Sequence, residues 1–121
     1  MLNKLLSKRI GQAKEHEAKL WLASHQVRII DQNVSCKGGE IDLIGELASP
    51  IPTIVFFEIK YRASDQFGHP LETLTHSQMQ RIRRCAEQYL KKNTQYHQHL
   101  IRFDVVAWQG EQAKEWLTNA F

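Results

Sequence analysis

The amino-acid sequence predicts one α/β domain of 121 residues in which helices pack against a mixed sheet. Two amphipathic segments, one near the N-terminus and one over residues 75–93, have apolar side chains at helical spacing. Three strand-like segments follow one another between them, and a fourth comes after the second helix. Because a long helix precedes the fourth strand, a crossover should place it parallel to a central strand.

The first helix is expected over residues 7–25, since apolar side chains recur there at helical spacing. They are Ile10, Ala13, Ala18, Trp21 and Leu22. Residues 27–33 then have the pattern of a strand. The turn sequence of residues 37–39 leads to a second expected strand over residues 40–47.

A third strand is expected over residues 53–61, after the proline-containing break of residues 48–52. Three strands in succession suggest a meander. A polar loop is expected next, over residues 62–74, because Gly68 and Pro70 disfavour a helix or a strand there.

The second helix opens with a capping box of Thr75 and Gln78 and is expected to end near Asn93. Polar and basic side chains gather on the side of this helix opposite its apolar residues. They are Arg81, Arg84, Gln88, Lys91 and Lys92. With a net charge of +3 and a pI near 9.0, such a face is either simply solvated or in contact with nucleic-acid phosphates.

The last expected strand covers residues 101–107, which alternate between apolar and polar side chains. Arg102 and Asp104 share one face of this strand, so we expect them to pair. Residues 112–121 form an edge strand, a short helix or both.

Composition favours an ordinary cytoplasmic protein: 42% of the residues are hydrophobic and 24% are charged, which suits one core. No segment approaches the roughly 20 apolar residues of a membrane span, and the N-terminus lacks a signal-peptide cleavage site. Cys36 and Cys85 form no CxxC pattern. We therefore expect two free thiols rather than a disulfide, a redox site or a zinc site.

Acidic residues inside two strand-like segments are the clearest functional signal. Strand alternation places Glu40, Asp42 and Ile44 on one face of the second strand. It places Glu58 and Lys60 on one face of the third, so pairing of the two strands would bring Asp42 beside Glu58. Buried carboxylates are costly unless partnered, which suggests either a cation site beside a reactive phosphate or an internal ion pair with the lysine.

These motifs resemble the PD-(D/E)xK nuclease superfamily, and within it the small bacterial YraN family of predicted endonucleases, related to archaeal Holliday junction resolvases. The similarity spans most of the chain: residues 11–22, Asn33, residues 39–44, 55–62, 67–68 and 102–106. Ile41 stands where the superfamily's name has proline, and Gln78 where such proteins often carry a lysine.

The resemblance implies a restriction-endonuclease-like α-β-β-β-α-β core with a mixed central sheet flanked by helices. It also implies a Mg²⁺ (or Mn²⁺) ion held by Asp42, Glu58 and the carbonyl group of Ile59. Lys60 would orient or activate the attacking water, or stabilise developing charge.

Glu15 is the third acid that the resemblance implies, in the first helix above the metal site. A helical wheel alone leaves both Glu15 and Glu17 open, and an exposed acid is the plain alternative. Glu40 is expected to lie close behind the metal ligands or to point into water.

The function expected from this resemblance is metal-dependent phosphodiester hydrolysis, by an endonuclease acting on branched or structured DNA. A non-catalytic nucleic-acid-binding or scaffold protein is the alternative. Nucleic acid is the expected partner, and a symmetric dimer is plausible because the chain is small. The residues expected to contact nucleic acid are Arg62, Arg81, Arg84 and Lys91.

Overall fold

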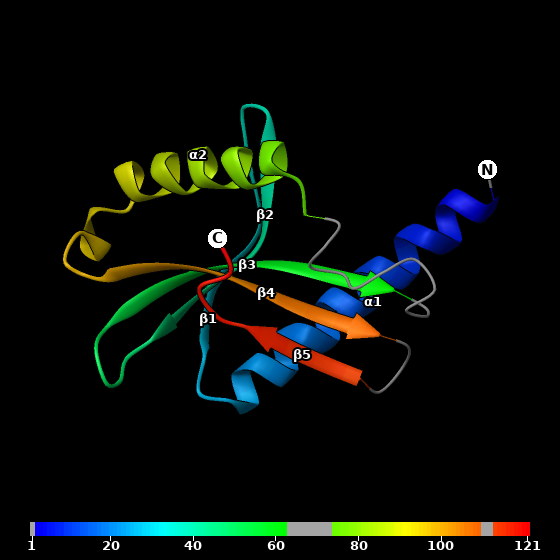
Figure 1. The fold of residues 1–121 in the computed structure, drawn as a ribbon, viewed down its shortest axis with the longest axis horizontal. Helices are drawn as coiled ribbons and strands as arrows, with labels where there is room; N and C mark the ends of the chain where they lie inside the picture. The colour runs from blue at the N-terminus through cyan, green and yellow to red at the C-terminus, as the bar shows by residue number, and fades with distance from the viewer. Residues whose placement is uncertain (1, 63–73, 110–112) are drawn as a thin grey trace.

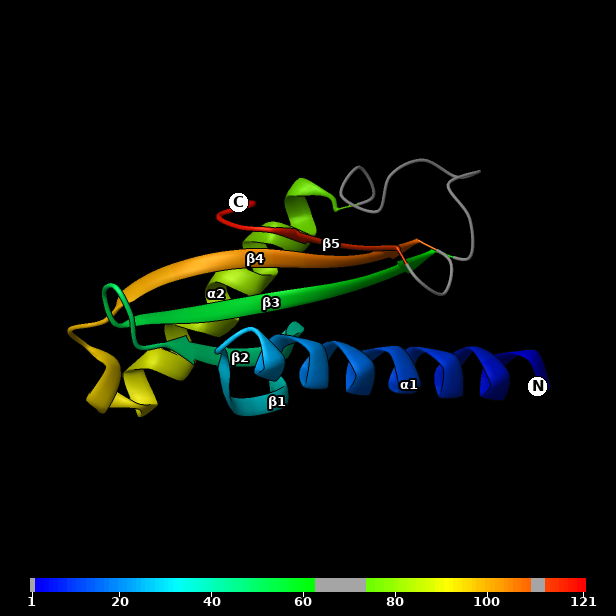
Figure 2. The same cartoon turned by 90° about the horizontal axis from the view of Figure 1, so that it is seen from below.

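Five strands form one mixed sheet in the computed structural model, which describes residues 2–62, 74–109 and 113–121. The helices and strands within these ranges occur in the following order: α1 (Leu2–Ser24), β1 (Arg28–Cys36), β2 (Gly39–Leu47), β3 (Thr53–Arg62), α2 (His76–Lys92), the 3₁₀ helix η3 (Thr94–Tyr96), β4 (Leu100–Gln109) and β5 (Ala113–Leu117). Figure 1 shows α2 on one side of the sheet and α1 on the other. The N-terminal part of α1 extends past the end of the sheet (Figure 2).

The strands lie in the order β1-β2-β3-β4-β5. The first three form an antiparallel meander, as the short connections indicated. After the α2 crossover, β4 runs parallel to β3, and β5 lies antiparallel to β4 at the edge. The mixed sheet is therefore confirmed, and the C-terminal segment contributes an edge strand.

The capping box of α2 is also present, because the backbone N–H of Gln78 donates to the side chain of Thr75 and the backbone N–H of Thr75 donates to the side chain of Gln78.

Strand β1 continues to Cys36, beyond the expected end at residue 33. Two irregularities hide its full length from the sequence pattern. The register with β2 shifts between Ile29 and Asp31, and Asn33 has a left-handed φ of 50°. Each interrupts the two-residue alternation by which a strand is recognised. Helix α1 likewise starts at Leu2, before the expected residue 7.

Two apolar clusters cover the two faces of the sheet. Neighbouring residues of β3 divide between them, with Phe56 on the α2 side and Phe57 on the α1 side. The buried members on the α2 side include Ile41, Ile44, Ile54, Ile82, Ala86, Phe103 and Val105. Those on the α1 side include Ala18, Leu22, Val27, Leu43, Val55, Val106 and Trp108. This division into two layers holds β3 and β4 at the centre of the molecule.

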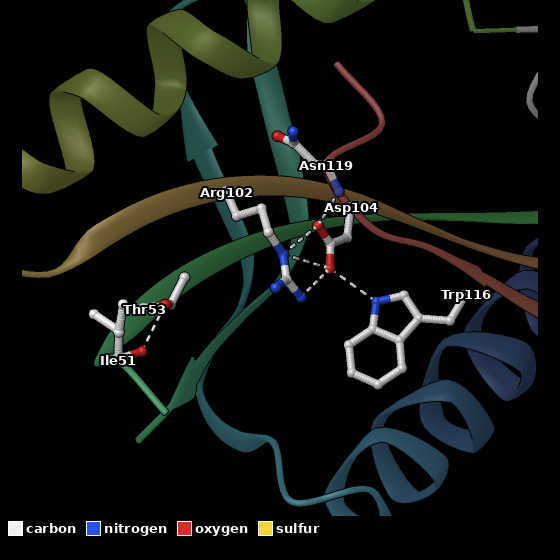
Figure 3. A network of polar contacts seen from close by, with 6 residues as sticks. All are labelled: Ile51, Thr53, Arg102, Asp104, Trp116 and Asn119. Carbon is white, nitrogen blue, oxygen red and sulfur yellow. Dashed lines mark hydrogen bonds and ion pairs between the residues drawn. The ribbon is translucent and has the colours of Figure 1, made fainter. Parts of the chain in front are cut away.

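The buried side chain of Asp104 ties the C-terminal segment to β4, as Figure 3 shows. Its carboxylate accepts hydrogen bonds from Arg102 (Nε 2.9 Å, Nη2 2.8 Å), from Trp116 Nε1 at 2.8 Å and from the backbone N–H of Asn119 at 2.9 Å. The expected pairing of Arg102 with Asp104 is confirmed. Because every donor meets the same buried acid, this network is structural.

A disulfide joins Cys36 to Cys85, with their Cα atoms 5.5 Å apart. The expectation of two free thiols was wrong. It rested on local spacing, whereas these cysteines are 49 positions apart and meet only because the end of β1 crosses α2. No helix in the described part of the chain is long and apolar enough to span a membrane.

Candidate active site

The candidate site lies where β2 and β3 separate. These strands pair in antiparallel register as far as Leu43 and Phe57. Asp42 and Glu58 come immediately beyond that last pair. From there the β1–β2 hairpin leaves β3 and its tip passes beside α2 (Figure 1). The Asp42 Oδ2 atom accepts a hydrogen bond of 2.8 Å from the backbone N–H of Ile59, which anchors the acid across the opening.

Asp42 and Glu58 form a directly interacting pair of carboxyl groups. Burial raises the pKa of Glu58 to about 8, and the charge of Asp42 adds to this effect. Burial also raises the pKa of Asp42, although the hydrogen bond from Ile59 opposes the change. The Nζ atom of Lys60 lies 3.5 Å from Glu58 Oε1 and only partly offsets the cost of burying the acids. The pair therefore retains a proton near neutral pH.

Two pockets open on opposite faces of the sheet at this point. The α1-side pocket is lined by Gln12, Glu15, His16, Gln32, Asn33, Asp42 and Leu43. The α2-side pocket is lined by Gly39, Glu40, Glu58, Gln78, Arg81 and Ile82. Asp42 and Glu58 thus line different pockets, while their side chains contact each other.

The expectation that Asp42 and Ile44 share one face of β2 was wrong. Ile44 packs in the cluster beneath α2, whereas Asp42 lines the α1-side pocket. Ile41 and Ile44 both pack in that cluster although they are three positions apart, so strand alternation breaks between them. Asp42 nevertheless reaches Glu58 because β2 and β3 have separated.

Glu15 is the acid of α1 that faces the site. It is half-buried in the α1-side pocket, and its pKa is raised by burial and then by the nearby charges of Asp42 and Glu40. Glu17 is exposed and forms an ion pair of 3.4 Å with Lys14. The structure thus brings Glu15, and not Glu17, to the carboxyl pair.

The basic residues expected to contact nucleic acid are dispersed. Arg81 lines the α2-side pocket, whereas Arg84 and Lys91 are exposed and line neither pocket. At a rise of about 1.5 Å per residue, Lys91 lies roughly 15 Å along α2 from Arg81. The side chain of Arg62 and the whole of residues 63–73 lie outside the described part of the structure.

Sequence reasoning missed the positions of Asn33 and Gln78. Asn33 faces Asp42 across the hairpin, between the paired residues on either side, and lines the same pocket. Asn33 has a left-handed φ, which asparagine adopts more readily than most residues. An asparagine inside a strand-like segment was therefore the available sequence signal for this irregular position. Gln78, noted for the capping box and as a departure from the superfamily pattern, lines the α2-side pocket.

A divalent cation would have to be held by few protein ligands. In the described ranges, no three His, Cys, Asp or Glu side chains lie close enough to hold one metal ion together. Asp42 and Glu58 supply two carboxyl groups, and the remaining ligands would come from backbone carbonyl groups, water or substrate. This donor set suits Mg²⁺, which typically binds one or two carboxylates and keeps several waters.

Comparison with known proteins places the chain in a family. Residues 14–108 match the model of the family described as "Uncharacterised protein family UPF0102". A UPF0102 protein of Photobacterium profundum is 40% identical over 111 residues, which are 90% of this chain and 86% of that protein. One of Pseudomonas putida is 37% identical over 117 residues, 93% of each chain. One of Klebsiella pneumoniae is 38% identical over 117 residues, 96% of this chain and 88% of that protein. The chain therefore belongs to the UPF0102 family, the YraN family that its motifs resemble.

Proposed function

We propose that this protein is a metal-dependent nuclease that hydrolyses phosphodiester bonds, acting as an endonuclease on branched or structured DNA. The observation that carries the proposal is the Asp42–Glu58 carboxyl pair, which lies at the separation of two strands with Lys60 beside it. Burying two acids together costs free energy that Lys60 offsets only in part, and this favours a positively charged ligand at the pair.

A Mg²⁺ or Mn²⁺ ion fits this pair. Its ligands would be Asp42, Glu58 and the carbonyl group of Ile59, the last as the superfamily resemblance implies. Burial and then the charge of Asp42 raise the pKa of Glu58 to about 8, and a divalent ion would offset both effects by stabilising the charged carboxylates. When bound, it supplies the charge that makes a water more nucleophilic and stabilises the added negative charge of the transition state.

The residues around the pair have separable tasks. The backbone N–H of Ile59 fixes the orientation of Asp42. Lys60 places an ammonium group 3.5 Å from Glu58, where it can orient the attacking water or a phosphate oxygen. Arg81, at the α2-side pocket, offers a guanidinium group to a neighbouring phosphate, and Glu15 adds a half-buried acid from the α1 side.

The test is cleavage by the purified protein of supercoiled, linear, single-stranded and four-way DNA, with Mg²⁺, Mn²⁺ or chelator. Asp42→Asn and Glu58→Gln should each reduce cleavage at least a hundredfold, because each replaces a charged metal ligand with a neutral amide of similar shape. Glu17→Gln, which changes an exposed acid of α1, should cleave like the unaltered protein. Cleavage that persists in chelator or in Glu58→Gln would contradict the proposal.

A second candidate function is non-catalytic binding of nucleic acid by the same surface. The observation that favours it is that Asp42 and Glu58 line pockets on opposite faces of the sheet. It predicts DNA binding without cleavage, unaffected by Asp42→Asn or Glu58→Gln. Gel-shift assays with the four DNA forms, run beside the cleavage assay, distinguish the two functions.

A further inference from the structure

The Cys36–Cys85 disulfide lies directly behind a wall of the candidate site. Gly39 is the register partner of Cys36 across the hairpin, and it lines the α2-side pocket. A Cβ atom at Gly39 would lie 3.2 Å from Cys85 Sγ and 3.4 Å from Cβ of Arg81. The bond therefore holds the hairpin in tight contact with α2 about one turn beyond Arg81.

The hairpin has few other attachments at this level. Its ladder with β3 ends at Leu43, so residues 39–42 pair with β1 alone in the sheet. Asp42 is linked to β3 through its side chain, by the hydrogen bond from Ile59. The turn between Cys36 and Gly39 is exposed. Val34 and Ile41 pack against the cluster beneath α2, and the disulfide is the covalent part of the contact.

The disulfide thus links two walls of one pocket. Gly39 and Glu40 belong to the hairpin, whereas Gln78 and Arg81 belong to α2. Asp42 is on the same strand as Glu40, so a movement of the hairpin would displace one member of the carboxyl pair relative to Glu58, which β3 holds in the centre of the sheet.

We propose that Cys36 and Cys85 form a reversible redox clamp on the hairpin that carries Asp42. In the oxidised form the clamp fixes the hairpin against α2; in the reduced form the hairpin opens away from α2 and the candidate site loses affinity for a divalent cation. The second half of this proposal rests on the proposed function, whereas the first half does not.

The reductant is a cellular dithiol, and the exchange is balanced. A thiolate of the dithiol attacks the sulfur of half-buried Cys36, because Cys85 is only 1% exposed, and Cys85 leaves as a thiolate. The second thiol of the dithiol then displaces Cys36 from the mixed disulfide. Two electrons and two protons pass to the cysteines, and the dithiol becomes a disulfide. Oxidised glutathione re-forms the protein disulfide from the two thiols and is itself converted to two molecules of reduced glutathione.

The first experiment measures free thiols and amide hydrogen exchange of the full chain after treatment with oxidised glutathione or with dithiothreitol. We expect no free thiols in the oxidised form and two in the reduced form. On reduction, exchange over residues 34–42 should become at least tenfold faster relative to exchange over residues 54–58 of β3, which changes only as far as the stability of the whole fold changes. Cys36→Ser should match the reduced form without reductant, and Ser35→Ala, an exposed neighbour, should match the oxidised form.

Three results would overturn the clamp. The first is two free thiols after oxidation. The second is equal exchange over residues 34–42 in both forms. The third is an equal acceleration over residues 34–42 and over residues 54–58, because the bond would then hold the whole fold rather than the hairpin.

The second experiment titrates Mn²⁺ into the oxidised protein, the reduced protein and Cys36→Ser. The expected result is at least tenfold weaker binding by the reduced protein and by Cys36→Ser. Equal Mn²⁺ affinity in all three would overturn the regulatory half of the proposal. If no form binds Mn²⁺, the proposed function and the regulatory half both fail, whereas hydrogen exchange still decides the clamp.

Discussion

The proton that Glu58 holds makes the stability of the folded protein depend on pH. The pKa of Glu58 is raised to about 8 by burial and by Asp42, from an ordinary value of 4.5. As pH rises, the unfolded chain therefore loses this proton near pH 4.5, and the folded chain near pH 8. Between these values the folded state binds the extra proton, so its stability falls as pH rises and then levels off above about 8.

Glu58→Gln should remove this dependence, because glutamine has no proton to lose and its amide can still donate to Asp42. Urea unfolding at pH 5, 7 and 9 should show the unaltered protein losing roughly 2–4 kcal/mol more than Glu58→Gln across that range. Adding Mg²⁺ at pH 9 should restore part of the loss in the unaltered protein alone. Parallel pH profiles of the free energy of unfolding for the two proteins would show that folding does not raise the pKa of Glu58.

Asp104 is the second residue whose replacement has a large expected effect. It is fully buried and accepts bonds from Arg102, Trp116 and Asn119. Asp104→Ala leaves these donors without their common acceptor, so we expect a loss of about 3–5 kcal/mol in the free energy of unfolding. Urea denaturation measures it, with the exposed Glu17→Gln as control. A loss below about 1 kcal/mol would mean that the C-terminal segment is held by other contacts.

The chemistry-bearing residues were more predictable than their orientation. Asp42, Glu58 and Lys60 stand out because acids interrupt strand-like apolar runs, which needs only the sequence. That Asp42 turns toward α1 could not be foreseen, since it depends on where β2 leaves β3, and this depends on contacts between distant segments. The choice between Glu15 and Glu17 required the family resemblance for the same reason.

At the scale of elements, close packing at Gly45 sets how the start of β1 meets β2. A Cβ atom at Gly45 would lie 2.5 Å from Cγ1 of Val27 and 3.2 Å from Cε2 of Phe57. Both neighbours are buried, so they have little room to move. Gly45 therefore lets the chain after α1 approach the sheet.

Gly45→Ala should destabilise the protein by about 1–3 kcal/mol through overpacking. Adding Val27→Ala should recover part of the loss, because it removes the methyl group that the new Cβ atom meets. Thermal or urea unfolding of both single variants and the double variant gives the coupling energy. Strict additivity of the two changes would show that Val27 is not the residue in conflict.

Local signals explain which elements were predictable. The capping box located the start of α2, and the order of strands and helices predicted both the meander and the parallel β4. The end of β1 was not predictable by alternation, because a register shift and the left-handed Asn33 interrupt the pattern. The start of α1 was placed too late, although Leu2, Leu5 and Leu6 already stand at helical spacing before residue 7.

For the whole molecule, the disulfide closes a loop of 49 positions that contains Asp42, Glu58 and Lys60. In the chain-entropy view such a bond restricts the unfolded chain and adds up to about 4 kcal/mol of stability. Dithiothreitol should therefore lower the urea midpoint of the unaltered protein and leave Cys36→Ser unchanged. An equal midpoint with and without reductant would indicate that the loss of unfolded-chain entropy is offset in the folded state.

The hydrogen bond from Ile59 to Asp42 has a consequence for any mutational study of this protein. Where β2 departs, the side chain of Asp42 accepts the N–H of β3 that the next rung of the ladder would have used. Truncation to alanine thus leaves a main-chain donor without its acceptor as well as removing a charge, so a loss of the proposed activity could result from local unfolding of the strand end. Only an isosteric amide, which keeps an oxygen for that donor, separates the two causes.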